Sequence, residues 1–154
     1  MSRQAEIRLA TEHDLPRLIE LYSQLELDAA RETVGSPILL SYGKAFKQIA
    51  GDPRQQLFVV EAEDRVVGTA CLVIMPNLTH RGRPYAIVEN VVVDADVRGL
   101  GYGELVMRHI IEQARSAGCY RIGLTSNQQR VDAHRFYEKL GFVTKQRSFR
   151  VDFD

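Results

Sequence analysis

A glycine-rich turn between an apolar segment and an amphipathic segment is the feature that most constrains this fold. Residues 91–93 are all valine, and β-branched residues in an apolar run predict a buried strand. The run breaks at Asp94, and glycines at alternate positions (Gly99, Gly101 and Gly103) then leave backbone N–H groups uncovered. Apolar residues at helical spacing follow, so the turn lies at a helix N-terminus, where unpaired N–H groups favour an anion. The sequence therefore predicts a phosphate-binding turn.

The remaining pattern predicts one mixed domain of strands and helices. A length of 154 residues fits a single domain, which we assign to residues 1–154. The expected class is α/β, more strictly α+β, with a sheet that is mostly antiparallel in its first half and about four flanking helices. Strands are expected at residues 5–10, 57–62, 66–75, 88–93, 120–125 and 148–153, and helices at residues 15–25, 37–51, 105–118 and 131–140.

The charge balance and the cysteine content argue against several classes of function. Lys and Arg number 20 and Asp and Glu number 20, so no overall field attracts nucleic acid or anionic lipid. No apolar stretch approaches the roughly 20 residues of a membrane helix, and the first residues do not resemble a signal peptide. Cys71 and Cys119 lack the spacing of a metal site. These features predict a cytoplasmic protein with two reduced thiols, no metal, and no nucleic-acid or membrane partner.

The spacing of the glycines excludes two familiar phosphate-binding motifs. A Walker A loop requires a lysine after its last glycine, and none is present here. A dinucleotide fingerprint requires Gly-x-Gly-x-x-Gly, but the third glycine position is occupied by Glu104 or by Val106, depending on the starting glycine.

A different spacing fits the turn. Arg98 begins an Arg-x-x-Gly-x-Gly pattern that resembles the signature binding the pyrophosphate of acetyl-coenzyme A (acetyl-CoA) in the GNAT family of N-acetyltransferases. Residues 133–142, Ala-His-Arg-Phe-Tyr-Glu-Lys-Leu-Gly-Phe, resemble that family's second motif, a helix that carries a tyrosine and ends at Gly-Phe. The order of elements is also similar from residue 5 to the end. One departure is Arg130, which occupies a position where many family members have Asn.

The resemblance implies a fold, a reaction and a cofactor site. The fold is the GNAT fold, with a central sheet splayed at its fourth strand. The reaction is transfer of the acetyl group of acetyl-CoA to a primary amine of a small molecule, by direct attack in a ternary complex. The backbone of Val91 and Val93 is expected to pair with the pantetheine arm. The pyrophosphate is expected at the N–H groups of the turn: Arg98, Gly99, Leu100, Gly101, Tyr102 and Gly103.

Two residues are candidates for the proton transfers that this reaction requires. Glu89 interrupts an apolar strand, where desolvation is costly and burial would raise the carboxyl pKa, and it is the candidate base. A structural carboxylate is the alternative. Asn90 is expected on the opposite sheet face. Tyr137 of the second motif is the family's usual acid for the departing thiolate, and a core aromatic residue is its alternative.

The acceptor site and the wider assignment are less constrained by the sequence. A non-catalytic acyl-CoA sensor and an acetyltransferase for protein amines remain alternative functions, and a homodimer is a common outcome in this family. His134 could shuttle protons. Other charged residues are candidates for binding the acceptor (His80, Arg81, Arg83, Glu26, Asp28 and Glu32) or the 3′-phosphate of the cofactor (Arg130 and Arg135), and an ordinary solvated charge is the alternative for each.

Overall fold

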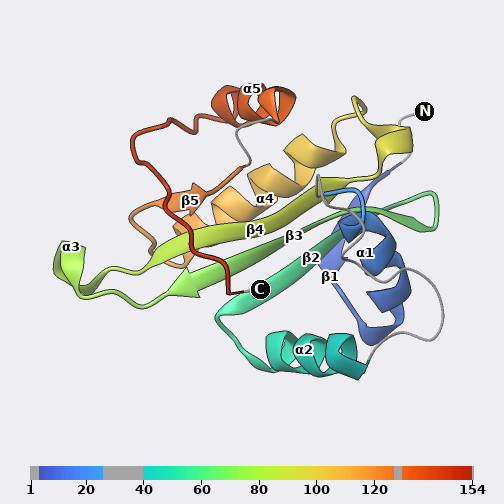
Figure 1. The fold of residues 1–154 in the computed structure, drawn as a ribbon, viewed down its shortest axis with the longest axis horizontal. Coiled ribbons are helices and arrows are strands. Elements are labelled where there is room, and N and C mark those ends of the chain that lie inside the picture. The colour runs from blue at the N-terminus through green and yellow to red at the C-terminus, as the bar shows by residue number, and fades with distance from the viewer. Residues whose placement is uncertain (1–3, 26–39, 127–129, 154) are drawn as a thin grey trace.

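The computed structural model describes residues 4–25, 40–126 and 130–153 as one five-stranded sheet with helices on both faces (Figure 1). The strand order follows the chain, β1-β2-β3-β4-β5, and only β5 runs parallel to its neighbour. The strands are β1 (Glu6–Leu9), β2 (Gln55–Ala62), β3 (Arg65–Met75), β4 (Tyr85–Val93) and β5 (Ile122–Leu124), and the helices are α1 (Leu15–Tyr22), α2 (Leu40–Gly51), α3 (Thr79–Gly82), α4 (Tyr102–Ser116) and α5 (Val131–Lys139).

Strand alternation divides the interior into two hydrophobic layers. Successive residues of a strand point to opposite faces, so Phe58 and Val60 of β2 pack toward α4 and α5, whereas Leu57 and Val59 pack toward α1 and α2. Figure 1 shows these helix pairs on opposite sides of the sheet. The mixed, mostly antiparallel sheet expected from the sequence is confirmed.

A β-bulge in β4 shifts the alternation of its side chains, so that positions of the same parity face different layers before and after the bulge. Glu89 is paired with Cys71 and Val92 with Thr69, so two residues of β4 lie opposite one residue of β3. Asn90, inside the bulge, has φ 55°, in the left-handed region. Val88 therefore packs against the α4 layer, and Val92 packs against the α1 layer although the two are four residues apart. The bulge therefore lets Val88 and Val92 of one strand pack into hydrophobic layers on opposite faces of the sheet.

The same bulge lies where β4 and β5 separate. Their parallel pairing runs from Ala86 with Ile122 to Val88 with Leu124, and β4 continues to Val93 after β5 has ended. The splayed fourth strand expected from the sequence is thus present. The edge of β4 that faced β5 is left without a strand partner in the described part of the chain.

The elements at the two ends of the chain agree only in part with the sequence-based expectations. The first helix begins as expected, with the Thr11 N–H donating to the Asp14 carboxylate over 2.7 Å. Pro37, the expected start of the second helix, lies outside the described residues. The prediction of a strand at residues 148–153 was wrong. These residues have no regular secondary structure, because no described strand pairs with them, and Phe149 and Phe153 are exposed. No helix in the described ranges is long and apolar enough to cross a bilayer.

Candidate active site

The glycine turn has the open backbone that the sequence predicts. Gly99 and Gly101 have φ of 82° and 90°, a region that L side chains rarely adopt, and the space that a Cβ would occupy at either position is empty. Gly101 is the N-cap of α4, and the first helical bond runs from the Leu105 N–H to the Gly101 carbonyl. The N–H groups of the first turn therefore have no acceptor within the helix and can meet an anion.

Gly103 has a different role from the other two glycines. A Cβ there would lie 3.2 Å from Cζ of Phe136 and 3.5 Å from Cγ2 of Val93. The first distance is tighter than ordinary contact, so the Phe136 ring of α5 would have to shift by a few tenths of an ångström to admit a side chain. The small size of Gly103 thus favours close packing of Phe136 against the first turn of α4.

A buried carboxylate braces the strand end from which the turn starts. The Asp94 side chain is 3% exposed and interacts with the guanidinium groups of Arg17 and, at 2.9 Å, Arg65. It also accepts a bond from the Asp96 N–H at the start of η3 (Ala95–Val97). Burial alone would raise the pKa of this carboxyl, but the Asp96 N–H and Arg17 outweigh burial and lower it. Sequence reasoning marked Asp94 only as the end of a strand.

The free edge of β4 presents backbone groups next to this turn. The Asp94 N–H donates to the Val67 carbonyl of β3. Because N–H and C=O groups alternate along an antiparallel strand, those of Val91 and Val93 are directed to the other edge. The exposed Arg98 side chain bends back there, and its Nε lies 3.2 Å from the Val93 carbonyl oxygen. A guanidinium donor therefore occupies one of the acceptors expected to pair with the cofactor.

A small cavity of about 110 Å³ opens where β4 and β5 separate. Its walls include both predicted catalytic residues, Glu89 and Tyr137, together with Asn90 of the bulge. Pockets for drug-sized molecules measure roughly 300–1,000 Å³, so this cavity matches a few reacting groups and not a whole cofactor. The structure therefore brings Glu89 and Tyr137 to one place, although they come from different faces of the sheet. Asn90, which the sequence places on the opposite sheet face from Glu89, also lines this cavity.

The environment of Tyr137 suits a proton donor. The ring is buried and packs edge-to-face against Phe136 and Phe142, with centroid separations of 5.2 Å and 5.9 Å. Burial raises the pKa of the phenol, and the nearby charge of Arg130 opposes this only in part. The phenol therefore keeps its proton at neutral pH.

Glu89 is exposed, not buried. The side chain lines the cavity at the splay and is reached by water, so the strand position is water-accessible and does not bury the carboxylate. An exposed carboxylate can accept a proton from a bound amine directly or through water.

Two cavity residues were not identified as catalytic candidates from the sequence. Arg130 precedes α5, is half-buried, and lies at the cavity, where its charge reaches the phenol of Tyr137. Ser126 follows β5, and its buried Oγ has no hydrogen-bond partner within the described residues. In the sequence, Arg130 is marked by its departure from the family pattern, whereas no sequence feature marks Ser126.

The other charged candidates do not join this cavity. His80 stacks on Tyr120 with 3.7 Å between ring centroids, and Arg83 donates to the Gly118 and Cys119 carbonyls, both at 3.3 Å. These contacts hold the loop before β4 against the end of α4. Arg135 is exposed on α5, and Glu26, Asp28 and Glu32 lie outside the described residues.

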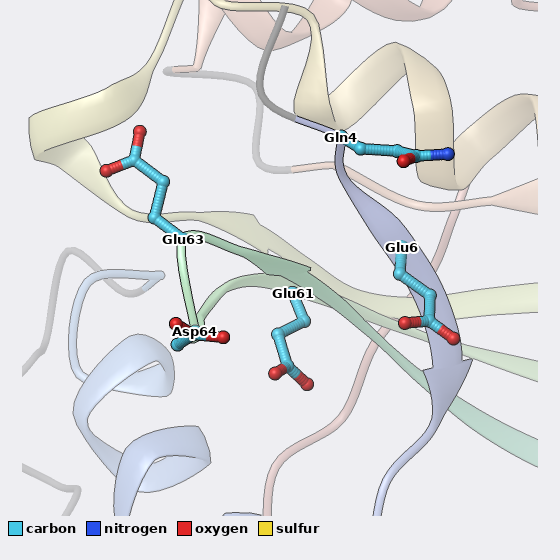
Figure 2. Close-up of a pocket in the computed structure, with 5 residues that line it drawn as sticks. All are labelled: Gln4, Glu6, Glu61, Glu63 and Asp64. Atoms are coloured by element: carbon cyan, nitrogen blue, oxygen red, sulfur yellow. The ribbon is translucent and has the colours of Figure 1, made fainter.

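A second hollow, of about 520 Å³, has the wrong charge for a phosphate-bearing cofactor. It lies beside β1 and the β2–β3 turn, and Figure 2 shows carboxylates on its walls. Its lining residues are Gln4, Glu6, Glu61, Glu63 and Asp64. One of them, Glu61, is neutralised by Arg8 at 2.7 Å. The remaining negative charge would repel a pyrophosphate, so the smaller cavity is the better candidate. No group of metal-ligating side chains occurs among the described residues.

Comparison with known proteins agrees with this geometry. Residues 15–142 match the model of the Acetyltransferase (GNAT) family. The chain belongs to the GNAT family. The family's members are N-acetyltransferases that use acetyl-CoA, and the match spans α1 to α5, including the turn and the cavity.

Individual relatives cover nearly the whole chain. The glucosamine 6-phosphate N-acetyltransferase of Trypanosoma brucei brucei is 34% identical over 152 residues, covering 96% of this chain and 95% of that protein. A structure from Bacillus halodurans C-125, described as a transcriptional regulator, has a TM-score of 0.93 at 35% identity and covers 97% of this chain and 100% of that one. Arabidopsis thaliana glucosamine-6-phosphate N-acetyltransferase has a TM-score of 0.82 at 26% identity, covering 98% and 99%.

Proposed function

We propose that this GNAT protein transfers the acetyl group of acetyl-CoA to the amino group of glucosamine 6-phosphate. The observation that carries the reaction is the cavity at the β4–β5 splay, which joins Glu89 and Tyr137 beside a free strand edge and an open helix N-terminus. The acceptor is suggested by the Trypanosoma relative, which is similar over almost its full length.

The cofactor would lie along the free edge of β4. Pantetheine amides would pair with the backbone of Val91 and Val93, as an added strand does. Pairing at the Val93 carbonyl requires Arg98 to leave it, which frees this guanidinium for a phosphate. The pyrophosphate would meet the N–H groups from Arg98 through Gly99, Leu100, Gly101 and Tyr102 to Gly103. This path ends with the thioester in the cavity.

The cavity residues would then divide the proton transfers between them. The amine must be neutral to attack, and Glu89 takes its proton directly or through water. The new C–N bond forms, the C–S bond breaks, and Tyr137 protonates the departing thiolate. Cys71 is a poor nucleophile for a covalent route, since burial and the charge of Glu89 raise its pKa to about 11. Attack is therefore direct, in a ternary complex.

A thiol-release assay with product detection by mass spectrometry tests this proposal. The purified chain and acetyl-CoA are incubated with glucosamine 6-phosphate, glucosamine, an aminoalkylphosphonate, a polyamine and a peptide with a free N-terminus. We expect the largest kcat/KM for glucosamine 6-phosphate. Faster acetylation of another amine would replace the proposed acceptor, and tight acetyl-CoA binding without any acetylated product would favour the sensor alternative.

A further inference from the structure

The cavity at the β4–β5 splay is electrically asymmetric. Arg130 approaches it from the start of α5, whereas Glu89 approaches it from β4. A guanidinium stays charged at every pH at which the protein is folded. A cavity of about 110 Å³ is therefore lined by one cationic and one anionic side chain, which come from different elements.

Acetyl transfer also generates charges of both signs on the reacting atoms. As the amine attacks, negative charge develops on the thioester oxygen and then on sulfur, while positive charge develops on nitrogen. A preorganised charge is most effective when it faces the atom on which the opposite charge appears. Glu89 suits the nitrogen. The thioester end requires a positive or hydrogen-bonding partner, and Tyr137 alone supplies only a neutral phenol.

Two groups that line this cavity, the hydroxyl of Ser126 and the guanidinium of Arg130, have not yet been assigned a part in the reaction. The buried Oγ of Ser126 has no partner among the described residues, and a buried hydroxyl without a partner is destabilising unless a bound molecule satisfies it. Arg130 lies near enough to Tyr137 for its charge to act on the phenol. Ser126, Arg130 and Tyr137 all line this cavity.

We propose that Arg130 and Ser126 stabilise the negative charge of the thioester as its C–S bond breaks, which adds two catalytic groups to Glu89 and Tyr137. The inference rests on acetyl transfer but not on the identity of the acceptor. The lone pair of the amine forms the C–N bond, and the electrons of the C–S bond pass to sulfur beside Arg130. Tyr137 then supplies a proton to sulfur, Glu89 receives one from nitrogen, and solvent restores both residues.

Variants of Arg130 test the proposal on whichever amine the wild-type chain acetylates. We expect Arg130→Gln to lower kcat about 10²-fold, with the dissociation constant of CoA, measured by calorimetry, changed less than about threefold. Arg130→Lys should recover part of the loss because it retains the charge. Guanidinium ions added to Arg130→Ala should also restore part of kcat, which a purely structural role would not allow. Ser126→Ala should lower kcat about tenfold, as expected for one neutral donor.

Matched controls separate this role from the alternatives. Arg115→Gln removes an exposed guanidinium at the far end of α4 and should keep wild-type kinetics. A loss confined to KM for phosphorylated amines would place Arg130 on the acceptor, and a loss confined to CoA affinity would place it on the cofactor phosphate. Either result, or a wild-type kcat in Arg130→Gln, would overturn the proposal. If no amine is acetylated by the wild type, the proposed function fails first, before any variant is measured.

Discussion

Cys71 of β3 lies directly opposite Glu89 of β4 in the antiparallel ladder. Residues paired in this way share a sheet face, so the thiol and the carboxylate are neighbours on the side of α1 and α2. Burial chiefly, and then the negative charge of Glu89, raise the pKa of the thiol to about 11. The thiol is therefore protonated across the working range, although it is close to the reaction centre.

This pairing predicts slow chemistry at Cys71. Because the thiolate is the reactive form, we expect little alkylation of Cys71 by iodoacetamide at pH 8, and faster alkylation in Glu89→Gln, where the repelling charge is gone. Peptide mass spectrometry measures both rates, with Cys119 as the half-buried internal reference. A rapidly alkylated Cys71, or an acetyl group found on it during turnover, would contradict direct transfer.

Replacing the buried phenol separates binding from chemistry. Tyr137→Phe keeps the ring packing against Phe136 and Phe142 and removes only the hydroxyl. We expect kcat to fall about 10²-fold, with CoA affinity unchanged. In the wild type the phenol must be protonated, and its raised pKa places the alkaline loss of activity above about pH 10. The rate of thiol release, measured across pH, checks where the alkaline loss begins. A wild-type rate in Tyr137→Phe would return this residue to the role of a core aromatic.

The exposed carboxylate should matter most when the amine is protonated. We expect Glu89→Gln to lower kcat/KM at every pH, with the largest deficit on the acid side, where the acceptor carries a proton that must be removed. The pH profile of the variant against the wild type measures this effect. Glu20→Gln, an exposed change on α1, is the matched control. A deficit independent of pH would indicate that Glu89 positions the substrate and does not act as a base.

Open backbone at the turn should determine cofactor affinity. Gly101→Ala places a Cβ at φ 90°, which strains the N-cap of α4 and shifts the N–H groups beside it. We expect the CoA dissociation constant to rise about tenfold or more, with a smaller change in kcat. Gly43→Ala, at an open position within α2, should leave CoA binding unchanged. Equal affinity in the two variants would remove the turn from the cofactor site.

The turn and the tyrosine helix were predictable because their signals are local. Glycines at positions that need positive φ, followed by helical periodicity, determine the start of α4 whatever packs around it. Tyr137 was found because its motif is contiguous. The proposed path of the cofactor along Val91 and Val93 rests on the resemblance to the family, and strand alternation adds only that these backbone groups are directed to the free edge.

The cavity walls were less predictable because they depend on contacts between distant segments. The bulge at Asn90 is a change of register between β3 and β4, and no local pattern in the sequence marks the extra residue. The exposure of Glu89 depends on where β5 stops pairing. Arg130 lines the cavity together with residues of β4, which are far from it in the sequence.

The buried carboxylate before the turn should contribute to stability more than its place in the sequence suggests. Asp94→Asn leaves Arg17 and Arg65 without their shared partner, and breaking a buried ion pair costs about 3 kcal/mol. The folded-state pKa of Asp94 is lowered, so its contribution is complete above the unfolded value of about 3.9 and is lost as pH falls through the folded value. Thermal melts from pH 7 to 3 should therefore show a deficit in Asp94→Asn that shrinks with acid. Asp96→Asn, which keeps the backbone N–H that Asp94 accepts, should melt as the wild type does. Equal melting of all three proteins would show that the turn does not depend on Asp94.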